Sequence, residues 1–309
     1  MKKRFLQIPL ILLCFIFIFS CRPGKNNANT EKNPRTYPCP QGLKTDVAWI
    51  VLEWNGKPVY GGYGSGFLID KAKGAFFTNK HVSDMFDALG KGSHKIFFNC
   101  KVYNVKIVKT SLLADAALVQ ITDPVGSSGL PDPAPFAKEK VKIGDEVVIE
   151  GYHLHPYFVR MSDEEEGYEF PLIPIFKNYY NLGTKNLGKE QEIVFEKLEA
   201  TVTATDQKIK VEGQGEGIAQ GIREDMNLYI EIKTTKDHKF PFGGLSGTAV
   251  KNKKGEIIGI FTAGPQLEFD PETKEELPDG PVSIKRVFKT ALLTPIESVE
   301  NLISYLDKR

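Results

Sequence analysis

The chain has 309 residues, little net charge, no internal repeats and no heptad pattern. Its 40 Lys and Arg residues are balanced by 39 Asp and Glu residues, which leaves a formal net charge of +1. This balance gives no electrostatic reason to expect nucleic acid as a partner. The composition, 41% hydrophobic and 26% charged, is that of an ordinary globular protein of one large or two small domains. The function must therefore be sought in individual sites.

Recognisable phosphate and metal motifs are also missing. The glycine-rich stretch 212–221 lacks the Gly-Lys-Ser/Thr of a phosphate loop, and the acidic run 163–166 lacks the Asx and Gly spacing of a Ca²⁺ loop. His153 and His155 would share one face of a strand, but no Cys or carboxylate stands at a recognisable spacing from them. We interpret them as a surface pair and expect no metal and no cofactor.

The one long apolar run lies at the N-terminus. Basic residues 2–4 precede an almost unbroken apolar stretch from Phe5 to Phe19, and residues 18–21 (Ile-Phe-Ser-Cys) resemble a bacterial lipobox. At about 15 residues the run is shorter than the ~20 that a membrane-spanning helix needs, although an uncleaved anchor is the alternative. We interpret residues 1–21 as a lipoprotein signal peptide, with the lipid on Cys21. The protein would then be exported and membrane-anchored in a bacterial cell envelope, in a leaflet that the sequence does not identify.

Residues 22–44 are mostly polar and are expected to form a flexible tether. Of the four cysteines, Cys14 would leave with the signal peptide and Cys21 would carry the lipid. Cys39 and Cys100 would remain in an oxidising compartment, where a disulfide between them is one interpretation. Two unrelated buried thiols are the other.

Short apolar runs separated by turn signals fill the chain from residue 45 onward. Such dense strands without a long helix favour small closed β-barrels. We expect one barrel over 45–123 and a second over 138–292. A C-terminal helix is expected over 295–307, where Thr294 and Glu297 fit a capping box.

Three stretches of sequence carry candidate chemistry. The first is Gly-Ser-Gly-Phe at 64–67, followed by Thr-Asn-Lys-His-Val ending at Val82. The second places Asp115 among apolar residues, where a carboxylate needs a buried partner that His81 could provide. The third is Phe-Gly-Gly-Leu-Ser-Gly at 242–247, whose glycines let the backbone bend sharply and let a ligand approach.

In this order the motifs resemble those of chymotrypsin-fold serine proteases, most closely the bacterial Deg/HtrA-like trypsin-type peptidases. The resemblance covers roughly residues 45–306. It implies an all-β fold of two six-stranded antiparallel barrels with a C-terminal α-helix. It also implies a protease domain over 45–309, and because nothing follows Arg309 we expect no PDZ domain. The order His–Asp–Ser differs from that of subtilisin-like enzymes and α/β-hydrolases.

The resemblance assigns a catalytic triad. Ser246 would be the nucleophile, His81 the general acid and base, and Asp115 the residue that orients the histidine. The N–H groups of Gly244 and Ser246 would form the oxyanion hole. The substrate pocket would be lined by Phe240, Phe242, Thr262, Ala263 and Gly264.

Three features depart from the family pattern. Leu245 stands where related enzymes have Asp or Asn, so it cannot form the ion pair with a freed N-terminus that activates trypsin-like zymogens. Thr248 stands where a second glycine is usual. Residues 153–191 read as an inserted surface loop beside the cleft.

The sequence therefore predicts a serine endopeptidase that acts on polypeptides without a cofactor. One alternative is a catalytically inactive binding module that uses the cleft and the 153–191 insertion. Another is an esterase or phosphatase acting on a non-peptide substrate. Cleavage specificity and oligomeric state are open.

Overall fold

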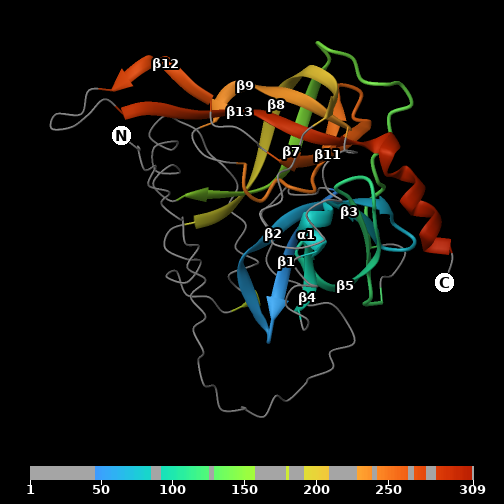
Figure 1. The fold of residues 1–309 in the computed structure, drawn as a ribbon. Helices are drawn as coiled ribbons and strands as arrows, with labels where there is room; N and C mark the ends of the chain where they lie inside the picture. Colours follow the sequence, from blue (N-terminus) through green and yellow to red (C-terminus); the bar gives the residue numbers. More distant parts are fainter. Residues whose placement is uncertain are drawn as a thin grey trace, which may run out of the picture. The chain divides into compact units, whose positions relative to one another are not determined.

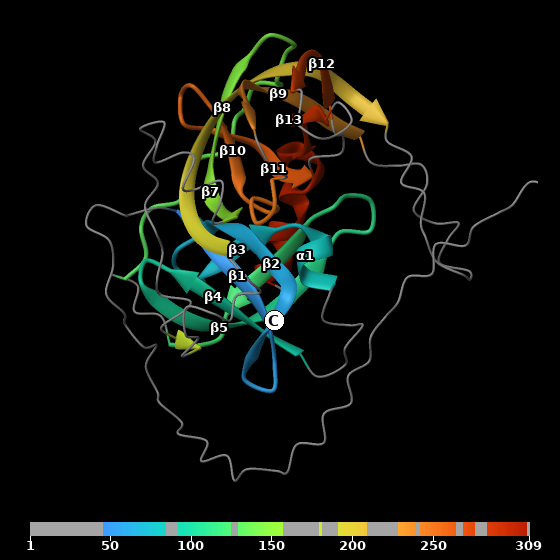
Figure 2. The ribbon, with the colours of Figure 1, turned by 90° about the vertical axis from the view of Figure 1, so that its left-hand side faces the viewer.

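The computed structural model describes residues 46–84, 92–124, 129–156, 179–180, 191–208, 228–238, 242–263, 268–275 and 283–307. Strands dominate these ranges, and no helix within them is long and apolar enough to cross a membrane. Figures 1 and 2 both draw the strands as two groups, one coloured blue to green and the other green to red. The expected all-β class is confirmed.

The first group is a closed antiparallel barrel with the strand order β1-β2-β3-β6-β5-β4. Its strands are β1 (Val47–Trp54), β2 (Lys57–Asp70), β3 (Ala75–Thr78), β4 (Gly92–Phe98), β5 (Lys101–Thr110) and β6 (Ala117–Ile121). Strand β1 is buried on both faces because alternate residues point to opposite sides. Ala48 and Ile50 pack inside the barrel, whereas Trp49 and Val51 pack with Tyr152 of the second group. The two groups therefore share apolar contacts.

The second group has the order β11-β10-β7-β8-β9-β13-β12, and a further pairing of β11 with β13 closes six of these strands into a barrel. The strands are β7 (Glu146–Pro156), β8 (Gln191–Lys208), β9 (Leu228–His238), β10 (Ala249–Asn252), β11 (Ile257–Ala263), β12 (Glu268–Glu275) and β13 (Ser283–Pro295). In the described residues, β12 pairs with β13 outside the closed barrel. The expected pair of six-stranded antiparallel barrels is thus confirmed.

The insertion expected over 153–191 is shorter than its sequence suggests. Strands β7 and β8 pair without a break from Glu146 opposite Thr201 to Pro156 opposite Gln191, so both ends of that range are strand. Residues 157–178 and 181–190 lie outside the described residues.

Tyr179 and Tyr180, within the expected insertion, contact the first barrel. Their rings lie 5.5 and 6.0 Å from the ring of Phe97, and the hydroxyl of Tyr180 donates to Glu53 at 3.1 Å. Burial is the main cause that raises the pKa of the Tyr180 hydroxyl, so this donor keeps its proton.

The C-terminal helix differs in type from the prediction. It forms as two 3-10 helices, η2 (Ile296–Ser298) and η3 (Glu300–Asp307), coloured red in Figure 1. The expected Thr294 cap is wrong, because η2 starts after Pro295 with no side-chain cap and the Thr294 hydroxyl instead bonds Thr262 at 2.7 Å. Ile296 and Leu302 belong to one core cluster with Phe77 of the first barrel, so packing and not capping holds this segment.

Candidate active site

The histidine and the aspartate expected in the catalytic site lie in contact. His81 belongs to helix α1 (Lys80–Asp84), and Asp115 lies between β5 and β6. One oxygen of Asp115 accepts the backbone N–H of His81 at 2.9 Å, and the other lies 2.7 Å from His81 Nδ1. A carboxylate accepts a ring N–H, so in the neutral imidazole this contact places the proton on Nδ1 and leaves Nε2 as an acceptor. Burial and, secondly, the charge of Asp115 raise the pKa of Tyr229 to about 12, so this neighbour stays neutral.

The serine loop, residues 242–248, is held by the first barrel. Gly244 and Gly247 have φ values of 96° and 93°, a region that residues with side chains rarely adopt. A Cβ atom on Gly247 would lie 2.0 Å from the carbonyl oxygen of Ser65 in β2. The N–H of Ser65 donates to the carbonyl of Ser246 at 2.7 Å, and its hydroxyl donates to the carbonyl of Gly244 at 2.8 Å. Strand β2 therefore fixes the loop backbone on both sides of residue 245.

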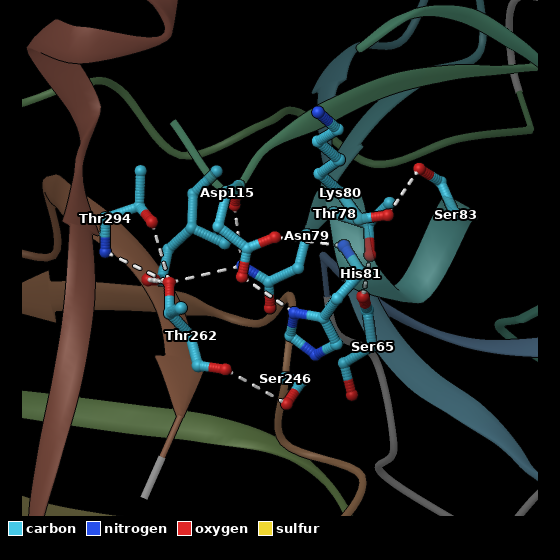
Figure 3. Close-up of polar contacts among 11 residues, drawn as sticks. Ser65, Thr78, Asn79, Lys80, His81, Ser83, Asp115, Ser246, Thr262 and Thr294 are labelled. Atoms are coloured by element: carbon cyan, nitrogen blue, oxygen red, sulfur yellow. Dashed lines mark hydrogen bonds and ion pairs between the residues drawn. The ribbon is translucent and has the colours of Figure 1, made fainter. Parts of the chain in front are cut away.

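The hydroxyl of Ser246 is turned toward β11. It donates to the carbonyl oxygen of Thr262 at 3.3 Å, and no hydrogen bond joins it to His81 in the part of the chain that the structure describes. Figure 3 shows the serine below the His81 ring, with its dashed line running to Thr262. At 3.3 Å this bond is longer than a normal O–H···O bond and is therefore weak.

Asn79, which is fully buried, connects the two halves of the site. Its Nδ2 lies 2.9 Å from the carbonyl of Asp115 and 3.2 Å from the hydroxyl of Thr262 (Figure 3). Thr262 in turn accepts from Ser246. A continuous set of hydrogen bonds thus runs from the histidine and aspartate of the first barrel to the serine of the second.

The backbone N–H groups expected to form the oxyanion hole are available. Within the described residues, the amides of Gly244 and Ser246 donate to no protein acceptor, whereas the flanking amides of Leu245 and Gly247 bond the carbonyls of Phe242 and Phe261. Unpaired donors on a fixed loop are what the stabilisation of a developing oxyanion requires.

The two unusual residues of the loop are accommodated by packing. Leu245 is fully buried and belongs to the core of the second barrel with Phe242. The hydroxyl of Thr248 donates to the carbonyl of Glu150 at 2.7 Å. Gly151 makes the room, because a Cβ atom there would lie 2.8 Å from that hydroxyl oxygen.

Comparison with known proteins agrees with this arrangement. A sequence model of the family described as "Trypsin-like peptidase domain" matches residues 64–260. The chain belongs to this family. It therefore contains a trypsin-like serine peptidase domain. A search of curated proteins found no match.

Solved structures of the Rv3671c protease from M. tuberculosis are similar to the chain. The active form is 16% identical, with 85% of this chain and 82% of that chain covered and a TM-score of 0.49. The inactive form is also 16% identical, with 85% and 89% covered and a TM-score of 0.45.

The remaining expected site residues of this trypsin-like domain are placed only in part. Phe242 is buried between His238 and Phe261, with ring centroids 5.0 and 5.8 Å away. Thr262 is buried and accepts the hydrogen bond of the Ser246 hydroxyl, and Ala263 is the last residue of β11. Cys100 is disulfide-bonded. The expected residues Phe240 and Gly264, the expected disulfide partner Cys39 and the expected lipid site Cys21 lie outside the described residues.

The interpretation of His153 and His155 as a surface pair is wrong. Both are buried, because β7 pairs with β8 along its whole length. They contact the carboxylate of Glu196 in β8, which also contacts His238 at the end of β9. One feature of the sequence indicates that Glu196 is buried. Val194, Leu198, Ala200 and Val202 alternate as core residues of β8, and Glu196 stands at a core position in that series.

Charge in this cluster is set by burial and hydrogen bonding. Desolvation raises the pKa of Glu196, but hydrogen bonds from the three imidazoles outweigh it and lower the pKa below its usual range. Burial lowers the pKa of His153. Glu196 is therefore an ionised carboxylate in the protein interior.

Proposed function

We propose that the chain is a serine endopeptidase that cleaves polypeptides through Ser246, His81 and Asp115. The two-point contact between Asp115 and His81 carries this proposal. It holds the imidazole as the Nδ1–H tautomer, which leaves Nε2 to take the proton of the serine hydroxyl. The Deg/HtrA-like motifs of the sequence support the same assignment.

In the proposed reaction, Ser246 Oγ attacks the peptide carbonyl carbon while His81 Nε2 accepts its proton. The N–H groups of Gly244 and Ser246 stabilise the oxyanion, and His81 then donates the proton to the leaving amine. Water hydrolyses the acyl-enzyme by the same route. The hydroxyl must first turn away from the Thr262 carbonyl, which costs little because that bond is weak.

The test is hydrolysis of a fluorescently labelled, unfolded protein substrate by the full-length chain and its variants, followed by the change in fluorescence. Ser246→Ala and His81→Ala should each reduce kcat by a factor on the order of 10⁴ or more, and the double variant should lose no more than either alone. Ser298→Ala, remote in η2, serves as the control with unchanged activity. Equal, low hydrolysis by the wild-type chain and all four variants would contradict the proposal.

One observation favours a second candidate, a protease-like binding module. The serine hydroxyl bonds Thr262 and not His81, as in a site that is not poised for reaction. A module of this kind would bind polypeptide in the cleft without turnover, and Ser246→Ala would leave its affinity and its lack of turnover unchanged.

We also propose that the protein is exported and lipid-anchored through Cys21, on the evidence of the N-terminal sequence. A labelled fatty acid should be incorporated into the wild-type chain and not into Cys21→Ala. Cys39 is the proposed disulfide partner of Cys100, so Cys39→Ser should expose a thiol that reacts with a maleimide. The substrate pocket around Phe240 stays a prediction.

A further inference from the structure

Three of the five histidines of the chain meet one carboxylate in the interior of the second barrel. The cluster consists of His153 and His155 from β7, Glu196 from β8 and His238 from β9. Their exposed fractions are 0%, 1%, 5% and 7%. None of these side chains has a part in the proposed peptidase reaction. Four buried polar groups are expensive to gather in a core, so the cluster calls for an explanation.

The nitrogen atoms approach the carboxylate from different directions. His153 Nδ1 and His155 Nε2 lie 2.6 and 2.9 Å from one oxygen of Glu196, and His238 Nε2 lies 3.4 Å from the other. The rings of His153 and His155 are nearly perpendicular at 87°, while those of His153 and His238 are stacked at 25°. Each residue offers one ligand atom, and these four atoms all lie within 4.8 Å of one another.

These dimensions suit a tetrahedral metal ion. Zn–N and Zn–O bonds of about 2.0–2.2 Å place neighbouring ligand atoms roughly 3.3 Å apart. His153 and His155 lie 2.6 and 2.9 Å from one Glu196 oxygen, His238 lies 3.4 Å from the other, and the four ligand atoms lie within 4.8 Å of one another. Small side-chain shifts would bring them to the separation that the ion needs. Imidazole nitrogens with one carboxylate favour Zn²⁺ and its first-row neighbours over Ca²⁺ or Mg²⁺, which prefer oxygen ligands.

We propose that His153, His155, Glu196 and His238 bind a first-row divalent metal ion, with Zn²⁺ as the fitting member of that class. Four protein ligands leave no open position for a substrate or for water. A closed, buried site of this kind is structural and not catalytic. The ion would fasten three adjacent strands of the second barrel to one another.

The proposed ion would also fix the orientation of one peptide group at the serine. Leu154, between the two ligands of β7, donates its N–H to the carbonyl of Gly243 at 3.1 Å. The peptide that carries this carbonyl also carries the N–H of Gly244, and no peptide bond of the described residues is cis. In a trans peptide the two groups point in opposite directions. Holding the carbonyl toward β7 therefore points the Gly244 N–H away from it, as an oxyanion donor requires.

A second contact reaches the same loop from β9. The His238 ring lies 5.0 Å from the ring of Phe242, the first residue of the serine loop. We infer that occupancy of the metal site organises the oxyanion hole. This coupling rests on the proposed peptidase function, whereas the metal site itself does not.

Metal content of the full-length chain, purified without a histidine tag or chelator, tests the site. Elemental mass spectrometry should find about one first-row divalent ion per chain. His153→Gln and His238→Gln should lose it, whereas His94→Gln, which removes a buried histidine outside the cluster, should retain it. A wild-type chain that holds less than about a tenth of an equivalent, and takes up no added Zn²⁺ in competition with a chromophoric chelator, would overturn the site.

Measurements on the wild-type chain keep the test decisive if the variants fail to fold. Adding Zn²⁺ to the chelator-treated chain should raise Tm by roughly 5 °C or more, because the ion binds the folded state. Co²⁺ should give the strong visible absorption of tetrahedral coordination. An unchanged Tm together with no such bands would mean that the cluster is a metal-free hydrogen-bond network.

Hydrolysis of a small activated ester tests the coupling. Metal removal should lower kcat/KM by about 10- to 100-fold, as expected for a misplaced oxyanion donor, and Zn²⁺ should restore it. Equal turnover with and without bound metal would overturn the coupling and leave the site and the peptidase function standing. Stoichiometric metal binding with no turnover in either state would overturn both the coupling and the peptidase function, and the site would stand.

Discussion

Ser65 contacts the serine loop through both its backbone and its side chain. Its N–H donates to the carbonyl of Ser246, and its hydroxyl donates to the carbonyl of Gly244 at 2.8 Å. Its own carbonyl accepts from Thr78 at 2.7 Å. The hydroxyl thus holds the peptide that follows Gly244, and Leu154 holds the peptide that precedes it. Both peptide planes next to an expected oxyanion donor are therefore fixed from outside the loop.

Ser65→Ala removes the hydroxyl bond and keeps the backbone bond. We expect kcat for peptide hydrolysis to fall by about 10- to 100-fold with KM little changed, since the loss concerns orientation of the oxyanion hole. The free energy of unfolding should fall by only about 1–2 kcal/mol. Ser298→Ala, which removes a comparable hydroxyl bond to the carbonyl of Pro295, should leave kcat unchanged. A similar kcat for both variants would refute this role of Ser65.

The sequence could indicate a candidate site residue only where that residue stands in a local motif. His81, Asp115 and Ser246 stand in short patterns that make them candidates without any knowledge of long-range contacts. Ser65 and Asn79 lie inside the same motifs, but their partners are far away along the chain, so their roles in holding the loop and joining the barrels emerged only from the structure.

The serine loop depends on close packing against β2 at Gly247. A Cβ atom there would lie 2.0 Å from the Ser65 carbonyl oxygen and 2.5 Å from the Thr78 hydroxyl. Gly144 has nearly the same φ, 94° against 93°, but nothing lies within 4 Å of the corresponding Cβ position. The two glycines therefore share a backbone conformation and differ in the space around them.

Gly144→Ala should cost about 1–2 kcal/mol of unfolding free energy, because only the backbone conformation is strained. Gly247→Ala should cost at least about 3 kcal/mol more and abolish activity, because the loop must move away from β2. Urea denaturation with a hydrolysis assay on the same samples measures both effects. Equal destabilisation by the two substitutions would show that the contact with Ser65 does not constrain the loop.

At the level of elements, the positions of the strands were predicted better than the strands with which they pair. The alternation of β7 placed His153 and His155 on one face, but whether that face is buried depends on the pairing with β8. Glu196 and His238 come from two other strands, so no spacing along the chain reveals them as partners. The C-terminal segment shows a similar limit, because its packing against the first barrel accompanies a 3-10 and not an α conformation.

The molecule as a whole contains a buried histidine that makes folding sensitive to acid. His94 in β4 is 4% exposed, and burial lowers the pKa of its imidazole to about 2 from an ordinary value of 6.5. Below pH ~6.5 the unfolded chain binds a proton that the folded chain does not bind. The free energy of unfolding therefore decreases as the pH decreases, by up to about 1.4 kcal/mol per pH unit.

His94→Gln should remove this part of the acid sensitivity. Between pH 7.5 and pH 5, the wild-type chain should lose about 2 kcal/mol more stability than the variant does. Urea unfolding at the two pH values gives the difference, and groups common to both proteins cancel. Parallel pH dependence of the two chains would show that His94 is not held neutral by the fold.

We propose that Ser246 is a nucleophile activated by His81. The most direct test of this proposal is labelling of the full-length chain by a fluorophosphonate probe, read as intact mass, with Ser246→Ala as control. We expect a single adduct on the Zn²⁺-loaded wild-type chain and none on the variant. Absence of an adduct on the metal-loaded wild-type chain across neutral to mildly alkaline pH would contradict the proposal.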